Sequence, residues 1–188
     1  MSQVNESFFK KHDEEGGSRR ILKNWNLKLV GFLAITWSLF QLWYASPLPF
    51  LLDFGKFIDV PARAIHLAFG MSLCFLAYPI LKSKRNSSIG TVDFILALVS
   101  ILVTFYLVIE YERLVYRQGI LASIDFFGLI IPYELILGSF GVLLLLEATR
   151  RAIGIPLVAI ALIFLLFSIF GQKMPDLISH QGLSITRL

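Results

Sequence analysis

GSFGVLLLLEATRRAIGIPLVAIALIFLLFSIFG, residues 138–171, is the stretch that decides the fold. Two continuous apolar segments meet in it at a short polar sequence, EATRR. Long apolar segments are typical of helices that cross a lipid bilayer, and a polar sequence between two of them lies at a membrane face. We therefore expect the chain to cross the membrane, turn at a hinge made by Glu147, Arg150 and Arg151, and cross back.

The composition of the whole chain agrees with this interpretation. Of its 188 residues, 56% are hydrophobic and only 16% are charged, and the mean hydropathy is +0.74. Charged residues make up roughly a quarter of an ordinary soluble domain. The net charge of +4 comes mostly from Lys and Arg residues at the ends of apolar segments, which membrane topology explains better than nucleic-acid binding does. The composition indicates an integral membrane protein.

Five segments approach or reach the roughly 20 apolar residues that a helix needs to cross a bilayer. They are residues 29–44, 62–81, 92–109, 132–148 and 155–170. Only helices and closed barrels satisfy their backbone hydrogen bonds in lipid, and these continuous apolar runs lack the alternation of a barrel. We predict an all-α integral membrane protein with about five transmembrane helices.

The distribution of basic residues predicts the orientation. If all five segments cross, eleven of the 17 Lys and Arg residues lie on the same side as the N-terminus. The positive-inside rule then places the N-terminus in the cytoplasm and the C-terminus outside. The first apolar run has no cleavage site for a signal peptidase, so we expect it to remain as an anchor.

Two polar features precede the first predicted crossing. Residues 1–18 are too polar to bury a core, and we expect a mobile cytoplasmic tail. Apolar residues recur at helical spacing within residues 19–28, which predicts a short amphipathic helix on the membrane surface. On such a helix Arg19, Arg20 and Lys23 would contact lipid phosphates.

A charged stripe follows the third apolar segment. Tyr106, Glu110, Arg113 and Arg117 recur every three or four residues, which predicts that the helix continues beyond residue 109 before an apolar loop returns along the membrane. The stripe would be exposed on the outer side. It is either a docking face for a soluble binding protein or a solvated helix held by its own weak ion pairs.

The sequence offers few groups for catalysis. His66 is the only histidine in a predicted crossing, and because membrane haem generally takes two histidines, we expect it to be a packing or interfacial residue. Asp93 and Glu134 lie near predicted helix N-termini, where capping is a simpler role than ion coordination. Motifs typical of hydrolases and nucleotide-binding proteins are missing from the sequence. We expect no enzymatic activity and no metal or cofactor in this chain.

Small and charged residues in the fourth segment predict its contacts. Gly138, Gly141 and Ala148 fall near one helical face, and small residues allow helices to approach closely in lipid. Glu147 lies one turn before the two hinge arginines, which predicts local pairing at the cytoplasmic surface, with direct substrate binding there as the minority alternative.

The C-terminal sequence resembles a known family. LLEATRRAIGIPLVAIALIFLLFSIFGQKMPDLISHQGLSITRL, residues 145–188, resembles the N-terminal part of the membrane permease of tripartite ATP-independent periplasmic (TRAP) transporters. Within that family it is most similar to the branch that uses a TAXI-type periplasmic binding protein, where the small and large membrane subunits are commonly fused. VIEYERLVYRQG (108–119) and ARAIHLAFG (62–70) support the same resemblance, which covers residues 25–188.

The resemblance implies a secondary transporter of the bacterial inner membrane. In that family a secreted binding protein delivers a small organic anion, often a carboxylate, to the permease. The large (M-type) subunit carries the substrate site and the coupling-ion site, for Na⁺ or H⁺, on a moving elevator domain. The small (Q-type) subunit extends the static scaffold. The partners implied for this chain are the large subunit, the periplasmic TAXI-type protein and membrane lipids.

This sequence matches the small part of such a permease. Residues 29–149 correspond to the four-helix small subunit, 150–172 to the hinge and a fifth, connecting helix, and 173–188 to a periplasmic segment leading towards the large subunit. The large part is either a separate chain or a continuation of this one. Two other classes remain open from the residues: a self-sufficient small channel or carrier, and a cofactor-binding subunit of a membrane enzyme.

Overall fold

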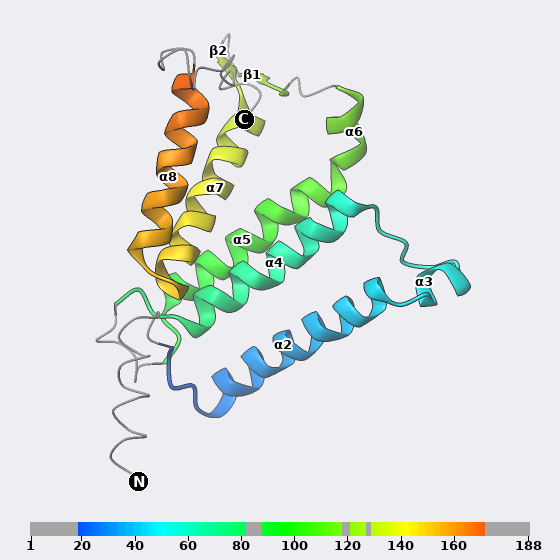
Figure 1. The fold of residues 1–188 in the computed structure, drawn as a ribbon, viewed down its shortest axis with the longest axis vertical. Helices are drawn as coiled ribbons and strands as arrows, with labels where there is room; N and C mark the ends of the chain where they lie inside the picture. The colour runs from blue at the N-terminus through cyan, green and yellow to red at the C-terminus, as the bar shows by residue number, and fades with distance from the viewer. Residues whose placement is uncertain (1–18, 82–87, 118–120, 127–128, 172–188) are drawn as a thin grey trace.

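The computed structural model describes residues 19–81, 88–117, 121–126 and 129–171. This part of the chain is helical except for one short β-hairpin (Figure 1), so the predicted helical class is confirmed. The elements in chain order are α2 (Asn24–Ala45), α3 (Leu48–Leu51), α4 (Asp59–Ala77), α5 (Thr91–Ile109), α6 (Tyr111–Tyr116), β1 (Ile124–Phe126), β2 (Leu129–Ile131), α7 (Tyr133–Ala152) and α8 (Ile155–Phe170).

All five predicted apolar segments are helices. Three of them, α2, α4 and α5, are long and apolar enough to cross a membrane. The fourth, α7, has 20 residues with charged side chains in its first and last turns, and α8 is apolar but has only 16 residues. Crossing by α7 and α8, and the orientation of the chain, therefore stay predictions.

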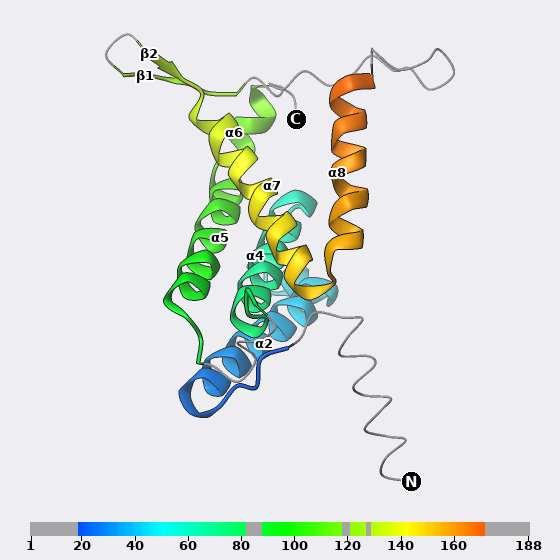
Figure 2. The same cartoon turned by 90° about the vertical axis from the view of Figure 1, so that its left-hand side faces the viewer.

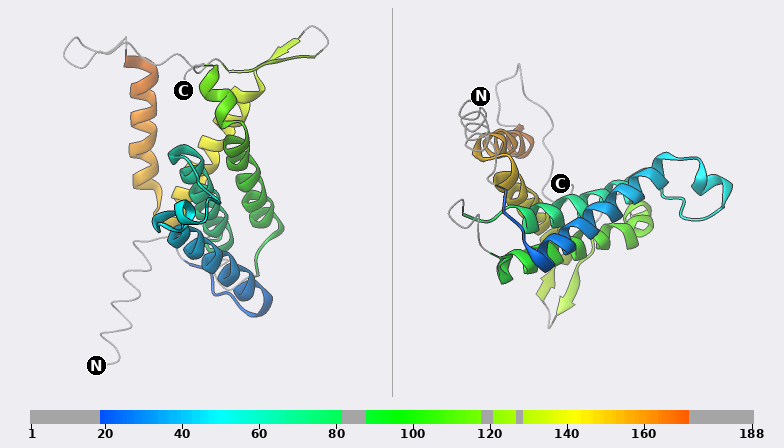
Figure 3. Two further views of the ribbon diagram at one scale, coloured as in Figure 1. Left: turned by 90° about the vertical axis from the view of Figure 1, so that its right-hand side faces the viewer. Right: turned by 90° about the horizontal axis from the view of Figure 1, so that it is seen from below.

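The helices pack around α4. It forms a long antiparallel contact with α5, and α2 lies alongside it on another face, as Figure 1 and the view from below in Figure 3 show. Helix α7 packs against both α4 and α5. The last helix, α8, packs against α7 and stands apart from the others (Figure 2). The buried apolar core accordingly comes from four helices: Val30, Met71, Phe75, Leu76, Ala97, Val103, Leu144 and Ala148.

The predicted surface helix over residues 19–28 is wrong for residues 19–23, whereas residues 24–28 are helical. Helix α2 begins at Asn24. The physical reason is that Arg20 is held by the protein: its backbone N–H donates to the carbonyl of Ala77 at 2.7 Å, at the end of α4. This bond draws the segment away from a lipid-facing helix.

The charged stripe after α5 also differs from the prediction. The helix ends at Ile109, Glu110 adopts φ −90° and ψ 5°, and α6 is a separate helix of six residues. The predicted continuous helix is therefore wrong. Beyond it, the expected membrane-bound loop instead contains β1 and β2, which pair antiparallel with Ile124 opposite Ile131.

The turn between the last two helices lies a few residues later than the predicted hinge. Helix α7 continues through the hinge residues to Ala152, so the expected domain boundary at 149/150 falls within a helix. The chain turns at Gly154, whose φ of +118° is a conformation that L side chains rarely adopt. The predicted tail at 1–18 and the predicted periplasmic segment at 173–188 lie outside the described residues.

Candidate functional site

The strongest polar feature is a buried set of charges, the Asp93 cluster, made of Arg20, Asp93, Glu147, Arg150 and Arg151. Asp93 in the first turn of α5 is its centre. Its Oδ2 accepts a hydrogen bond from Nη2 of Arg20 at 2.5 Å, and its Oδ1 accepts one from Nη1 of Arg151 at 2.7 Å. One carboxylate thus joins the segment before α2, the start of α5 and the end of α7.

The second carboxylate of the cluster organises the end of α7. Oε1 of Glu147 accepts from Nε of Arg151 and from Nη2 of Arg150, both at 2.8 Å. Its Oε2 accepts from Nε of Arg150 at 2.7 Å. Glu147 therefore joins the two arginines, as their spacing of three and four residues allows.

The centre of the Asp93 cluster is buried inside the protein, whereas the side chains of Arg150 and Glu147 are 39% and 29% exposed. The exposed fraction of the side chain is 0% for Arg151, 1% for Arg20 and 8% for Asp93. The guanidinium carbon of Arg151 also lies 5.0 Å from the ring centre of Phe75, a cation–π contact. Burying charge is costly unless each charge is paired, so these contacts fix the positions of the three elements tightly.

A second buried carboxylate, Glu134 in the first turn of α7, lies at the other end of α5 and α7. Its oxygens accept from the hydroxyl of Tyr106 at 2.8 Å, from both terminal nitrogens of Arg117 at 2.5 and 3.0 Å, and from the backbone N–H of Ala122 at 2.5 Å. The hydrogen bonds between Arg117 and the Glu134 carboxylate raise the pKa of the Arg117 guanidinium above its ordinary value. We call Tyr106, Arg117, Ala122 and Glu134 the Glu134 cluster.

The two clusters join α5 and α7 at both ends. Asp93 and Tyr106 are 13 residues apart on α5, a separation of about 20 Å at 1.5 Å per residue. Between them α5 carries only apolar residues, Ser100 and Thr104, and both hydroxyls donate to carbonyls of their own helix. The pattern of an apolar layer between two charged layers fits a helix pair at membrane depth.

The carboxylates of the two clusters are already paired with donors from the protein. Every carboxylate oxygen of Asp93, Glu134 and Glu147 already accepts at least one hydrogen bond. Within the described ranges, no group of three or more His, Cys, Asp and Glu side chains is placed to hold a metal ion. The arrangement can therefore hold the helices in fixed positions relative to one another.

Asp93 and Glu134 lie in the first turns of α5 and α7, as expected, but neither makes a capping hydrogen bond. Neither residue is the N-cap of its helix. Instead both carboxylates reach residues on other elements. Sequence reasoning missed these partners because Arg20 and Arg151 lie 73 and 58 residues from Asp93. The available signal was the isolated acid itself, since a carboxylate at the end of an apolar helix needs a partner.

The predicted docking stripe is divided by the fold. Tyr106 and Arg117 turn towards Glu134, whereas Glu110 and Arg113 form a separate pair at 3.4 Å. The Arg113 side chain is 78% exposed, so this residue remains available to a partner. The four residues do not form one exposed face.

The expected lipid-phosphate contacts include one error. Arg20 is buried on Asp93 and cannot face a headgroup, whereas Arg19 is exposed and so is Lys23. His66 packs against α2, where its ring meets that of Trp37 edge to face at 5.0 Å. Its Nδ1 lies 2.6 Å from the amide nitrogen of Gln41 on α2, and Arg63 pairs with Asp59.

The three small residues of α7 have different surroundings. A Cβ atom added to Gly141 would lie 3.1 Å from Cγ1 of Val103, so this glycine permits close contact with α5. Ala148 is 5% exposed within the core, and its carbonyl accepts a hydrogen bond from the thiol of Cys74 at 3.1 Å. A Cβ at Gly138 would meet nothing within 4 Å. Two of the three thus lie in a tight helix contact.

The comparisons with known proteins provide no further assignment for these clusters. No family model, no curated protein and no solved structure matches this chain.

Proposed function

We propose that this chain is the small membrane subunit of a binding-protein-dependent secondary transporter, similar to the TAXI branch of TRAP transporters. It scaffolds a large elevator-type subunit in the bacterial inner membrane for ion-driven uptake of a small organic anion, most often a carboxylate. The sequence resemblance described above motivates this proposal, with its most specific part at residues 147–154 and at Met174 and Pro175. We further propose five crossings, with the N-terminus in the cytoplasm.

The observation that carries the scaffold role is the uncovered apolar surface of the outer helices. Helix α8 has no buried residue, and α2 has a single one, Val30. Large apolar side chains along both helices are exposed, among them Phe32, Ile35, Leu39, Ile163, Phe164 and Leu166. Apolar surface of this extent faces either lipid or another membrane protein. A subunit that extends a larger scaffold needs such a surface.

The charge clusters support a static rather than a transporting role. A site that binds and releases an ion needs ligand oxygens that can exchange partners. In this chain the carboxylates of the two clusters are held by arginines, a tyrosine and a backbone amide. The coupling ion, Na⁺ or H⁺, then binds in the large subunit.

The two alternative functions require different sets of residues. A self-sufficient channel or carrier needs polar residues that line a pathway, and a cofactor-binding membrane enzyme needs a ligand set. An absorption spectrum and a metal analysis of the purified chain test the second alternative. A bound chromophore or a stoichiometric metal would favour it over the scaffold.

Reconstitution tests the proposal directly. The full chain is placed in proteoliposomes alone, with the large subunit, and with the large subunit plus the binding protein, and uptake of radiolabelled succinate and glutamate is measured under a Na⁺ or H⁺ gradient. We expect no uptake by the chain alone and co-purification of the large subunit with it. Uptake by the chain alone would overturn the scaffold role.

Docking of the binding protein is tested by charge reversal at Arg113. The matched control is Arg63→Glu, because the Arg63 side chain is 77% exposed and is paired with an acid one turn away, much like Arg113. We expect Arg113→Glu to lower binding-protein-dependent uptake and Arg63→Glu to leave it unchanged. Equal effects of the two variants would remove Arg113 from the docking face. Arg117 is unsuitable for this test because reversing it places a second carboxylate against Glu134.

A further inference from the structure

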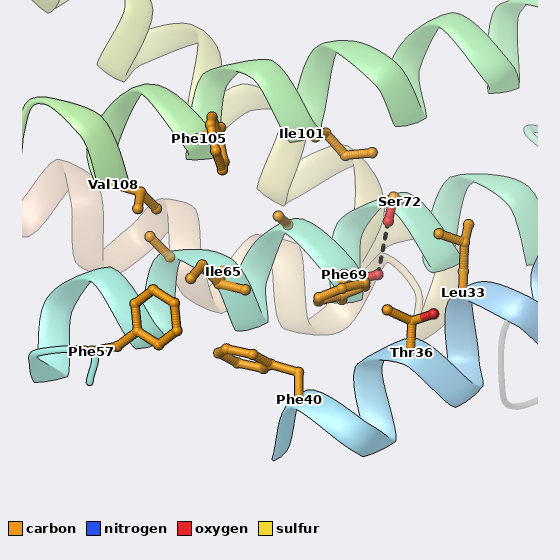
Figure 4. A pocket seen from close by; sticks show the side chains of 12 residues that line it. Leu33, Thr36, Phe40, Phe57, Ile65, Phe69, Ser72, Ile101, Phe105 and Val108 are labelled. Atoms are coloured by element: carbon orange, nitrogen blue, oxygen red, sulfur yellow. Dashed lines mark hydrogen bonds between the residues drawn. The ribbon is translucent and has the colours of Figure 1, made fainter. Parts of the chain in front are cut away.

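An apolar groove lies between α2, α4 and α5, away from both charge clusters. Its volume is about 400 Å³, and it is open on one side. Figure 4 shows Phe40 of α2 and Phe57 of the connection to α4 at one end, with Phe105 and Ile101 of α5 along the opposite wall. The rings of Phe40 and Phe57 contact each other edge to face at 5.9 Å. The proposed scaffold role does not use this groove.

The wall of the groove is entirely apolar. Two hydroxyl residues line it, but each hydroxyl is used by its own helix: Ser72 donates to the carbonyl of Phe69 at 3.0 Å, the dashed line in Figure 4, and Thr36 to that of Phe32 at 2.9 Å. Water in such a groove would find no hydrogen-bond partners. The chemistry of the wall therefore selects a hydrocarbon.

The groove lies at membrane depth. Its three walls are α2, α4 and α5, the helices that are long and apolar enough to cross a bilayer. Helix α2 packs on α4 without a comparable contact with α5, so the opening lies between α2 and α5. An apolar space of this size loses contact energy if left empty, and lipid chains surround it on the open side.

The size of the groove distinguishes an acyl chain from a whole helix. The groove follows α4 from Ala64 to Ser72, eight residues or about 12 Å, and its volume is about 400 Å³. A helix with side chains is about 10–12 Å across, so 12 Å of helix occupies roughly 1,000 Å³ and does not fit. A single partner side chain entering from the open side would fill only part of the length. A 12 Å stretch of an extended hydrocarbon chain, lying parallel to the helices, fits this volume.

Two ion pairs include residues that are next in sequence to the lining residues Phe57 and Ala64. Lys56 precedes Phe57 and pairs with Asp53, and Arg63 precedes the lining residue Ala64 and pairs with Asp59. Both pairs are largely exposed. Charges of both signs next to lining residues suit the phosphate and the glycerol region of a phospholipid headgroup, while the apolar groove holds its chain.

We propose that the groove between α2, α4 and α5 binds one acyl chain of a membrane phospholipid, with its headgroup beside Lys56 and Arg63. This site requires a membrane location and does not depend on the proposed transport role. A bound lipid then acts as a wedge that keeps α2 separated from α5 along the groove.

Native mass spectrometry of the full chain tests the site. The protein is released from nanodiscs made of phosphatidylethanolamine and phosphatidylglycerol, and the fraction that retains one phospholipid is measured. Ala68→Leu fills the groove from α4, and Ile101→Phe fills it from α5. If one variant fails to fold, the other still tests whether the groove binds lipid. The matched control is Ala159→Leu, which adds the same group as Ala68→Leu to an exposed position of α8.

We expect the wild type and Ala159→Leu to retain one phospholipid and a groove-filling variant with wild-type helicity to reduce that fraction about tenfold. Equal retention in all variants would overturn the proposal, and so would a wild type that carries no stoichiometric phospholipid. If Ala68→Leu leaves lipid retention unchanged but prevents another membrane protein from co-purifying, a partner side chain occupies the groove and the proposal is wrong.

Discussion

Asp93→Asn is the substitution that tests the buried cluster most directly. The amide keeps the size of the side chain but removes its charge, so Arg20 and Arg151 lose the carboxylate that both contact. Their side chains are 1% and 0% exposed, and neither can turn to solvent. Breaking a buried ion pair from one side typically costs about 3–5 kcal/mol, because the remaining charge stays buried without a partner.

The expected loss can be measured as a shift in the melting temperature. For a chain of this length, 1 kcal/mol of unfolding free energy corresponds to about 2–4 °C, so Asp93→Asn should lower the midpoint by roughly 6–20 °C. The assay is thermal unfolding of the purified chain in one fixed detergent, in which size-exclusion chromatography measures the folded fraction after heating. A second readout is trypsin cleavage after Arg19 or Arg20, which should become faster because the segment is no longer held to α5.

The matched control is Asp53→Asn. Asp53 also pairs with a cation, Lys56, but its side chain is 86% exposed, and exposed pairs contribute about 0–1 kcal/mol. If Asp93→Asn lowers the melting temperature no more than Asp53→Asn does, the cluster does not hold the three elements together. A replacement of Asp93, Arg20 and Arg151 by apolar residues of similar size should recover most of the lost stability, because it removes the unpaired charges.

Three further substitutions, at Glu134, Gly141 and Gly154, test the helix contacts and the turn. Glu110→Gln and Gly138→Leu are the controls for the first two, and each variant is measured by thermal unfolding in the same detergent. Glu134→Gln should cost more than Glu110→Gln, because Glu134 is 5% exposed and accepts four hydrogen bonds from three residues, whereas Glu110 has a single weak pair with the exposed Arg113; equal costs would argue against the second cluster. Gly141→Leu should destabilise by about 1–3 kcal/mol through overpacking against α5. Gly138→Leu, with open space around it, should change little, and a reversed order would contradict the packing. Gly154→Ala should cost about 1–3 kcal/mol because of its positive φ, and an unchanged midpoint would show that the turn can relax.

The helices could be predicted from sequence because their signal is local. Each apolar run satisfies its own backbone hydrogen bonds, so its residues alone indicate a helix, and α8 agrees with the predicted residues 155–170 at both ends. The pairing of Glu147 with the hinge arginines is local for the same reason. The contacts of Asp93 and Glu134 could not be read this way, because their partners lie on elements whose packing is decided by the whole fold.

The errors at residues 19–23 and at Glu110 have a common physical cause. In both places the helical spacing of the residues predicts a continuous exposed helix. In the structure an arginine side chain instead contacts a buried carboxylate. Arg20 reaches Asp93, and Arg117 reaches Glu134. A buried charge-assisted contact outweighs the few tenths of a kcal/mol that one extra pair contributes to an exposed helix.

The contacts of the helices separate a fixed part of the protein from a more weakly held part. The two clusters join α5 to α7 at both ends, and α4 packs against both helices. In contrast, α8 packs mainly on α7 and α2 mainly on α4, and the groove leaves α2 partly separated from α5. Because a helix held on one side can shift at lower cost than one held on several, changes at a partner or lipid contact should move α2 and α8 before they move the α4–α5–α7 unit. Hydrogen exchange should accordingly be slowest in α4, α5 and α7 and should slow in α2 when phospholipid is added, whereas uniform exchange across all five long helices would contradict this division.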